Sequence, residues 1–302
     1  MFTQHTSRRD FLLIVLASVS WGTVGVANRL LYDLGPTNAL SLSFLRLALS
    51  APFFFVASWL TLKRRLFTIT PHDLGVMVLM GCLIGLSQAL YIAAISYVGV
   101  SISTLIAICA APIIVALLSA LITRERITLM TLIALIAAIG GTALLMGAPA
   151  RSAASVGSPH LGALLAFLSA CGYAGFIFCG RLLTGSCHPL QISTVSFITG
   201  ALLLFTCAVS TRLVLSYPPS GWLILLYLGV VPTAVGYGIF QVGIRSISGT
   251  LASIITMCEP LTAAVLAWLL FHEELGSSGL LGAALLLTAM AIIVLVPKKY
   301  FE

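Results

Sequence analysis

The sequence predicts an all-α polytopic membrane protein of ten transmembrane helices, arranged as two inverted five-helix repeats. Three observations predict it. First, 60% of the 302 residues are hydrophobic and only 8% are charged, whereas about 25% of the residues of a soluble domain are charged. Second, the apolar residues form long stretches. Third, the two halves match in a collinear series. The composition excludes soluble enzymes, secreted disulfide scaffolds, nucleic-acid-binding modules and disordered chains.

A helix of about 20 mostly apolar residues spans the ~30 Å hydrocarbon core of a bilayer. Polar or Gly/Pro-containing breaks separate ten such stretches, which we place at 11–31, 38–62, 74–97, 101–122, 127–147, 161–182, 189–211, 221–244, 249–271 and 277–297. We therefore expect a first repeat over 1–147, an extracytoplasmic linker over 148–160 and a second, inverted repeat over 161–302. The other loops are short, so the function is expected to reside in the membrane-embedded part.

The basic residues predict the orientation of the chain. An even number of spans puts both termini on one side, and positively charged loops favour the cytoplasm. Cytoplasmic termini place eleven of the fifteen Lys and Arg residues inside, three outside, and Arg46 within a span. We expect a multi-pass protein of the bacterial cytoplasmic (inner) membrane with both termini in the cytoplasm. The net charge of +7 then reflects topology and not a nucleic-acid partner.

Matches between the two halves indicate a duplication. The paired residues are Trp21 with Tyr173, Arg29 with Arg181, Gln88 with Tyr237, and Pro112 with Pro260. Each half has an odd number of spans, so the second half enters the membrane from the opposite side. Two inverted repeats are typical of alternating-access carriers, whose symmetry supplies two nearly equivalent states.

Two charged residues lie well inside predicted spans, away from their ends, where insertion of a charge costs about 2.5–3.5 kcal/mol. Glu259 is expected near the middle of span nine. It is interpreted either as a proton or substrate-ammonium site, or as a structural carboxylate beside the backbone freed by Pro260. Arg46 is interpreted either as a partner for a substrate carboxylate or as a structural tie to loop carbonyls.

Aromatic and amide side chains supply the other candidates. Polar residues on spans three and eight recur at i, i+3 or i+4, so each set shares one helix face. Trp21 and Tyr173 lie at equivalent depths and can flank a flat ligand. The candidate substrate-binding residues are Trp21, Gln88, Tyr91, Tyr173, Tyr237 and Gln241. Packing between helices is the alternative for all of them. Pro112 and Pro260 are interpreted as hinges or as static kinks.

The order of these features resembles the drug/metabolite transporter superfamily, specifically its EamA-type ten-helix branch. The residues concerned are Trp21-Gly22, Phe44-Leu45-Arg46 and Glu259-Pro260 followed by His272-Glu273-Glu274-Leu275. Within that branch the chain is similar to YddG-type exporters of aromatic amino acids. The resemblance implies Phe, Tyr and Trp as cargo, outward movement, and a central cavity with spans five and ten at its periphery. The first repeat has Ala111 where the second has Glu259, so any role of that carboxylate is not symmetric.

Enzyme chemistry has little support in the sequence. All five histidines fall in loops or termini, and HExxH, GxSxG and Walker motifs are absent, so we expect no catalytic residue, metal or cofactor. The sequence favours a secondary transporter that exports small amphipathic metabolites, aromatic and other neutral amino acids, by alternating access. The alternatives are an exporter of cationic or aromatic drugs, an exchanger of anionic sugar phosphates or nucleotide sugars, and a non-transport membrane scaffold. Proton coupling and oligomeric state, monomer or homodimer, stay open.

Overall fold

The computed structural model describes residues 8–122, 124, 127–145, 158–271 and 276–295, and within these ranges every regular element is a helix. The first half contains α1 (Arg8–Asp33), α2 (Ala39–Leu62), η1 (Lys63–Phe67), α3 (Pro71–Ile122) and α4 (Leu129–Leu145). The second half contains α5 (Pro159–Leu182), α6 (Pro189–Ser210), α7 (Pro219–Leu228), η2 (Gly229–Val235), α8 (Gly236–Gly243), α9 (Gly249–Ile255), α10 (Cys258–Phe271) and α11 (Ser277–Leu295).

Eight of the described helical segments are long and apolar enough to cross a bilayer, and α4 and α11 are shorter apolar helices. The prediction of an all-helical polytopic membrane protein is therefore confirmed. The segment 146–157, which contains most of the expected linker, lies outside the described residues. The same is true of residues 125–126 and 272–274, which follow the two matched prolines.

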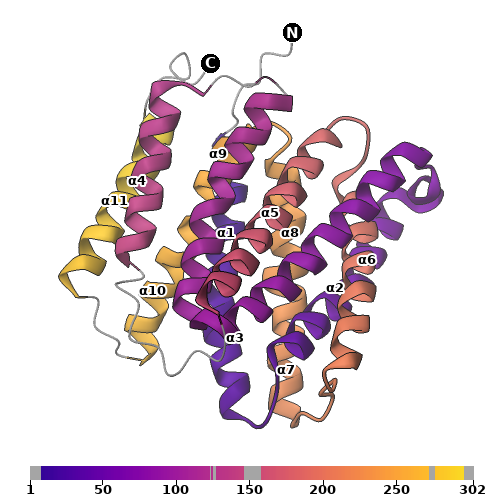
Figure 1. The fold of residues 1–302 in the computed structure, drawn as a ribbon. Helices are drawn as coiled ribbons and strands as arrows, with labels where there is room; N and C mark the ends of the chain where they lie inside the picture. Colours follow the sequence, from indigo (N-terminus) through magenta and orange to yellow (C-terminus); the bar gives the residue numbers. More distant parts are fainter. Residues whose placement is uncertain (1–7, 123, 125–126, 146–157, 272–275, 296–302) are drawn as a thin grey trace.

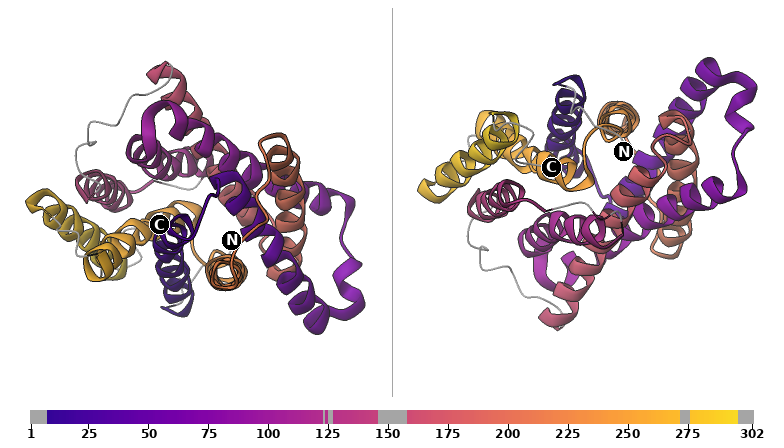
Figure 2. Two further views of the ribbon diagram at one scale, coloured as in Figure 1. Left: turned by 90° about the horizontal axis from the view of Figure 1, so that it is seen from below. Right: turned by 90° about the horizontal axis from the view of Figure 1, so that it is seen from above.

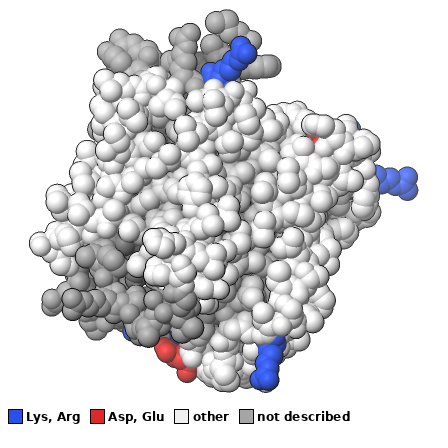
Figure 3. Space-filling view, in the orientation of Figure 1, with Lys and Arg blue, Asp and Glu red and all other residues white. Residues whose placement is uncertain are grey.

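Successive spans run in opposite directions through the bundle (Figure 1). We call the end where α1 begins the terminus side and the end where α1 finishes the distal side. On the terminus side Ser246 donates a hydrogen bond to Asp10. On the distal side the Asn38 amide donates to the Arg212 carbonyl over 3.0 Å. On the face shown in Figure 3 the described charges lie toward the two ends and on the η1 protrusion, with an uncharged belt between them. Such a belt fits a protein surrounded by lipid tails.

Helices α4 and α11 form a pair at the edge of the bundle. They pack mainly on each other, and α11 lies at the rim in both end-on views (Figure 2). The remaining spans pack more closely together: α3 lies against α5 and α6, and α1 lies against α8 and α10. The central helices are therefore the ones that can enclose a site.

The break expected between spans three and four is present, and two other expected helices, spans eight and nine, are interrupted. Gly99, at φ 77° and ψ 171°, divides α3 into two spans; glycine adopts positive φ without the steric cost of a side chain. Span eight contains the π-helical segment η2 around Pro232. Span nine was expected to be one helix, but it stops after α9 and restarts at Cys258. Glu259 therefore lies in the first turn of α10.

These interruptions also change the interpretation of the two matched prolines. Pro112 lies inside the continuous part of α3. Pro260 lies in the first turn of α10, where a helix has unpaired N–H groups and the missing donor of proline costs little. The break in span nine is thus at Thr256 and Met257, a few residues before the proline that was expected to cause it.

Gly81 allows α3 and α6 to approach closely. A Cβ atom on Gly81 would lie 2.4 Å from the Ser196 carbonyl oxygen and 2.6 Å from Thr199 Cβ. Both distances are too short for real atoms, so any side chain here must push the helices apart. Gly75, on the same helix, has no atom within 4 Å of an added Cβ.

The replacement Gly81→Ala is expected to lower the stability of the purified protein by ~1–3 kcal/mol, the usual cost of overpacking a dense interior. Thermal unfolding in detergent, followed by tryptophan fluorescence, measures the effect. Gly75→Ala is the matched control and should leave the melting temperature unchanged or slightly raised, because alanine is the better helix former. Equal melting temperatures for the two variants would contradict the close contact.

Candidate functional site

A cavity of about 710 Å³ lies between the central helices, and all the candidate residues named from the sequence line it except Gln241. Its walls come from α1, α2, α3, α5, η2, α8, α9 and α10, with Leu145 of α4 also touching it. On α1 the lining runs from Trp21 to Tyr32 and on α2 from Ala39 to Arg46. These are the distal halves of both helices, so the cavity occupies the distal half of the bundle and reaches toward its distal end.

Four aromatic rings pack together at the terminus side of the cavity, and two of them, Trp21 and Tyr237, line it. We call Trp21, Phe176, Phe197 and Tyr237 the aromatic layer. The Tyr237 ring centroid lies 4.6 Å from that of Trp21, 5.7 Å from that of Phe176 and 4.8 Å from that of Phe197. All four side chains are buried. The layer gives the cavity an apolar, aromatic floor.

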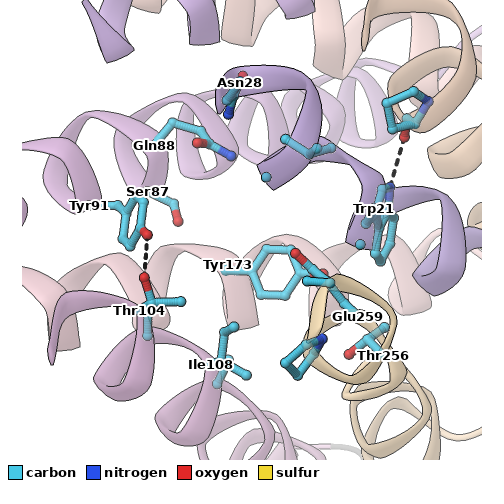
Figure 4. Close-up of a pocket in the computed structure, with 18 of the residues that line it drawn as sticks. Trp21, Asn28, Ser87, Gln88, Tyr91, Thr104, Ile108, Tyr173, Thr256 and Glu259 are labelled. Carbon is cyan, nitrogen blue, oxygen red and sulfur yellow. Dashed lines mark hydrogen bonds between the residues drawn. The ribbon is translucent and has the colours of Figure 1, made fainter. Parts of the chain in front are cut away.

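The Trp21 indole also fixes the π-helical segment. Its N–H donates to the Pro232 carbonyl oxygen over 2.8 Å (Figure 4). A π-helix leaves backbone groups without their usual α-helical partners, and a buried carbonyl needs a donor. Trp21 is therefore both a cavity-lining ring and a structural donor, which combines the two alternatives weighed for it from the sequence.

One wall of the cavity, formed by α1 and α3, presents neutral polar groups. In Figure 4 the Gln88 and Asn28 side chains lie close together at the cavity, and neither has a recorded hydrogen bond to a described residue. The Tyr91 hydroxyl, in contrast, is paired with the Thr104 hydroxyl at 2.5 Å. Ser87 donates to the Ser169 carbonyl oxygen over 2.8 Å. Gln88 and Asn28 are thus the amides available for a ligand, while Tyr91 and Ser87 join helices.

Arg46 and Glu259 place one charge of each sign on the cavity wall. Within the described residues neither is in an ion pair or a hydrogen bond, and the buried Arg46 Nε has no partner. Glu259 lies at the N-terminal end of α10, where the helix dipole favours negative charge. Arg46 is near enough to interact electrostatically with Glu259 and with Tyr237. The tie from Arg46 to loop carbonyls, one of its two interpretations, is not recorded within the described ranges.

Sequence reasoning missed Asn28, Thr104 and Thr256 as cavity residues. Asn28 could have been found, because it follows Trp21 by seven positions and so lies on the same helix face. Thr104 and Thr256 gave no comparable signal: Thr104 lies near the start of an expected span, and Thr256 lies at a break inside span nine that sequence periodicity does not mark. Among the described residues no group of three His, Cys, Asp or Glu side chains could hold a metal ion.

Contacts on the terminus side hold the bundle closed below the aromatic layer. The Arg181 guanidinium donates to the carbonyl oxygens of Ile244 and Arg245 over 2.8 and 3.0 Å. The Ser18 hydroxyl, which donates to the Ile14 carbonyl oxygen of its own helix over 2.8 Å, also lies 3.4 Å from the Ile255 carbonyl oxygen. Burial, and then the positive charge of Arg245, lower the pKa of His188, which caps α6 as a hydrogen-bond acceptor for the Leu190 N–H.

Comparison with known proteins identifies the family to which this architecture belongs. The model of the EamA-like transporter family matches the chain twice, over residues 9–147 and 160–295. The chain belongs to the EamA-like transporter family. It is therefore a multi-pass membrane transporter of small molecules, and the two matches cover the two halves between which the sequence showed its duplication.

Relatives of this EamA-like transporter cover nearly its whole length. It is 27% identical to the uncharacterized transporter YwfM of Bacillus subtilis, over 95% of this chain and 94% of the relative. It is 30% identical to an uncharacterized transporter of Archaeoglobus fulgidus, over 92% and 94% of the two chains. The inner membrane transporter YicL of Salmonella typhimurium, also uncharacterized, is 25% identical over 97% and 98%. One crystal structure shares the fold, with a TM-score of 0.81, 18% identity and coverage of 96% of this chain and 98% of that one.

Two glutamines of this EamA-like transporter should separate transport from stability. Gln191 has three partners: it donates to the carbonyls of Arg65 and Leu66 and accepts from the His188 N–H. Gln88→Ala is expected to lower transport about threefold to tenfold, the effect of one neutral hydrogen bond to cargo, with an unchanged melting temperature. Gln191→Ala should instead lower the melting temperature, because it removes the hydrogen bonds from α6 to the η1 carbonyls and leaves the buried Leu66 carbonyl without this donor. Flux in proteoliposomes and thermal unfolding measure both; a reversed pattern would contradict the assignment.

Proposed function

We propose that the protein is a secondary transporter that moves aromatic and other neutral amino acids, and similar small amphipathic metabolites, outward across the inner membrane by alternating access. The observation that supports this most directly is the composition of the cavity. One cavity has an aromatic floor, two amides without a hydrogen-bond partner among the described residues, and one charge of each sign. An aromatic amino acid has the matching parts: a flat ring, a carboxylate and an ammonium group.

Each part of the cargo has a residue that suits it chemically. The ring would rest on Trp21 and Tyr173, where aromatic contacts add about 0.5–1.5 kcal/mol beyond area burial. Arg46 suits the carboxylate, and Glu259 suits the ammonium group. Gln88 supplies a donor and an acceptor to whichever group lies near it. The cavity volume of about 710 Å³ falls within the ~300–1,000 Å³ of ordinary small-molecule sites.

The expected orientation in the membrane decides to which side the cavity opens. If both termini are cytoplasmic, as the basic residues predict, the distal side is extracytoplasmic and the cavity faces outward. Arg181 and the aromatic layer then form the closed cytoplasmic gate. Transport requires a second state in which this gate opens and the distal half closes, and the inverted halves of the chain provide for it.

The alternative cargoes have weaker support. An exchanger of sugar phosphates or nucleotide sugars needs several cationic groups, and Arg46 is the one Lys or Arg among the described lining residues. A cationic aromatic drug would use Glu259 and the aromatic floor but would leave Arg46 unmatched. A zwitterionic amino acid would pair its carboxylate with Arg46 and its ammonium group with Glu259.

Counterflow in proteoliposomes tests the proposal. Vesicles preloaded with unlabelled Trp or Phe should take up labelled amino acid faster than protein-free vesicles, across a panel of amino acids and at several pH values. Matched panels of a cationic dye and a sugar phosphate distinguish the alternatives. The cargo assignment is overturned if the protein accelerates the uptake of no aromatic or other neutral amino acid. An uptake rate that is independent of pH would argue against obligatory proton coupling.

A further inference from the structure

A layer of small and polar residues lies directly beneath the aromatic layer. Helices α5 and α8 run toward the terminus side and α6 runs away from it. One turn from Phe176, Phe197 and Tyr237 in the terminus direction therefore leads to Gly180, Ser193 and Gln241. These positions are i+4 on α5, i−4 on α6 and i+4 on α8. We call Gly180, Ser193 and Gln241 the polar layer.

The hydrogen-bonding groups of this layer are buried without partners. Gln241 is 2% exposed and Ser193 is fully buried. Neither the Gln241 Oε1 and Nε2 atoms nor the Ser193 Oγ atom has a hydrogen-bond partner among the described residues. Buried polar groups are nearly always hydrogen-bonded, and each exception calls for a reason. Here an amide and a hydroxyl without partners lie at the same level of the bundle.

On α5, Gly180 lies directly against the side-chain amide of Gln241. A Cβ atom on Gly180 would lie 3.1 Å from both Gln241 Nε2 and Gln241 Oε1. The Gly180 backbone therefore borders the amide directly, and any side chain at this position would crowd it. The next residue, Arg181, binds the carbonyl oxygens of Ile244 and Arg245, about one turn beyond Gln241. The order from cavity to terminus side is aromatic layer, polar layer and arginine contact.

We infer that Ser193 and Gln241 form a second, transient cargo site on the terminus side of the aromatic layer, closed in this structure and opened when Arg181 leaves the carbonyls of α8. This inference rests on the proposed function and extends it. An amide and a hydroxyl offer both donors and acceptors without a charge, so the site suits the polar head of a zwitterionic cargo. Gln241, which shares its helix face with Tyr237 but lies outside the present cavity, would then line the path in the opposite state.

Thiol accessibility tests the inference without any cargo. Ser193→Cys and Gln241→Cys are made in the otherwise unchanged chain, and the label from a membrane-impermeant, charged methanethiosulfonate is located by mass spectrometry. We expect both cysteines to react from the terminus side only, while Thr104→Cys in the cavity reacts from the distal side. Adding Arg181→Gln should raise the rate at both positions about tenfold, since losing a charged hydrogen-bond donor shifts a two-state equilibrium by about that factor.

Ser196→Cys is the matched control on the same helix. Ser196 is also fully buried, but its hydroxyl donates to the Met77 carbonyl oxygen over 3.0 Å against α3, so it should stay unlabelled from both sides. The inference is overturned if the cysteines at positions 193 and 241 both stay as unreactive as this control, or react from the distal side alone. Amino acid counterflow in the same vesicles reports separately on the proposed function: flux without labelling overturns only the second site.

Discussion

Replacing Glu259 by glutamine is expected to lower amino acid transport about 10- to 100-fold, the loss that corresponds to one charged hydrogen bond of ~1.5–3 kcal/mol. Glu259 lines the cavity at the first turn of α10 and has no ion-pair partner among the described residues. Its carboxylate is thus available for the ammonium group of a cargo. The substitution keeps the size of the side chain and one acceptor oxygen, replaces the other oxygen by an NH2 donor and removes the charge. Initial rates of counterflow with labelled Phe measure the effect.

Two comparisons make the Glu259 result specific. Asp73→Asn removes another acidic residue, at the terminus-side start of α3, and should leave counterflow unchanged. An analogue of Phe without the amine should compete poorly with the wild type, and its competition relative to Phe should improve in Glu259→Gln. A variant that transports Phe at the wild-type rate would remove Glu259 from the cargo site.

Trp21→Ala is expected to destabilise the protein by ~3–5 kcal/mol, as deletion of a large buried aromatic residue usually does, and to abolish measurable counterflow. The ring contacts Tyr237 and Phe240 at 4.6 and 5.3 Å. Its indole N–H is also the recorded donor to the Pro232 carbonyl oxygen. Removing both interactions frees the π-helical segment and opens a hole in the aromatic layer. Thermal unfolding in detergent and counterflow measure the two effects.

Trp21→Phe separates the two roles of this residue. Phenylalanine keeps an aromatic ring beside Tyr237 but cannot donate to Pro232. We expect stability to fall by ~1–3 kcal/mol, the cost of an unpaired buried carbonyl, with transport reduced and not abolished. If Trp21→Phe were as damaging as Trp21→Ala, the hydrogen bond rather than the ring would determine the effect on transport.

Sequence physics was sufficient for the architecture because a bilayer imposes strict rules. Apolar length predicts spans, since only closed backbone hydrogen bonding is tolerated in lipid, and nearly every expected helix is present in the structure. The interruptions inside spans were harder to predict. The break at Gly99 falls between two expected spans, whereas Thr256 and Met257 end α9 inside one expected span, with no Gly or Pro at the break itself.

The site was partly predictable for a related reason. Helical periodicity identifies the face on which Tyr237 and Gln241 both lie, and that face does point into the bundle. Periodicity gives no information on where along the helix axis a cavity is open. Tyr237 lies at the cavity floor and Gln241 lies one turn below it, in the closed half. Which turn is exposed depends on the conformational state, and that is a property of the packed bundle.

The two halves of the chain differ in how their helices are interrupted. The π-helix and the break at Thr256 both belong to the second half, in spans eight and nine, while the described parts of spans three and four are continuous on either side of Gly99. Identical halves would make the inward- and outward-facing states equal in free energy. Unequal halves make one state the resting state, so the apparent affinity for cargo should differ between the two membrane faces. This asymmetry changes the rates of loading and release, but a carrier without an energy source still obeys microscopic reversibility. Net direction is then decided by the cargo's own concentration gradient.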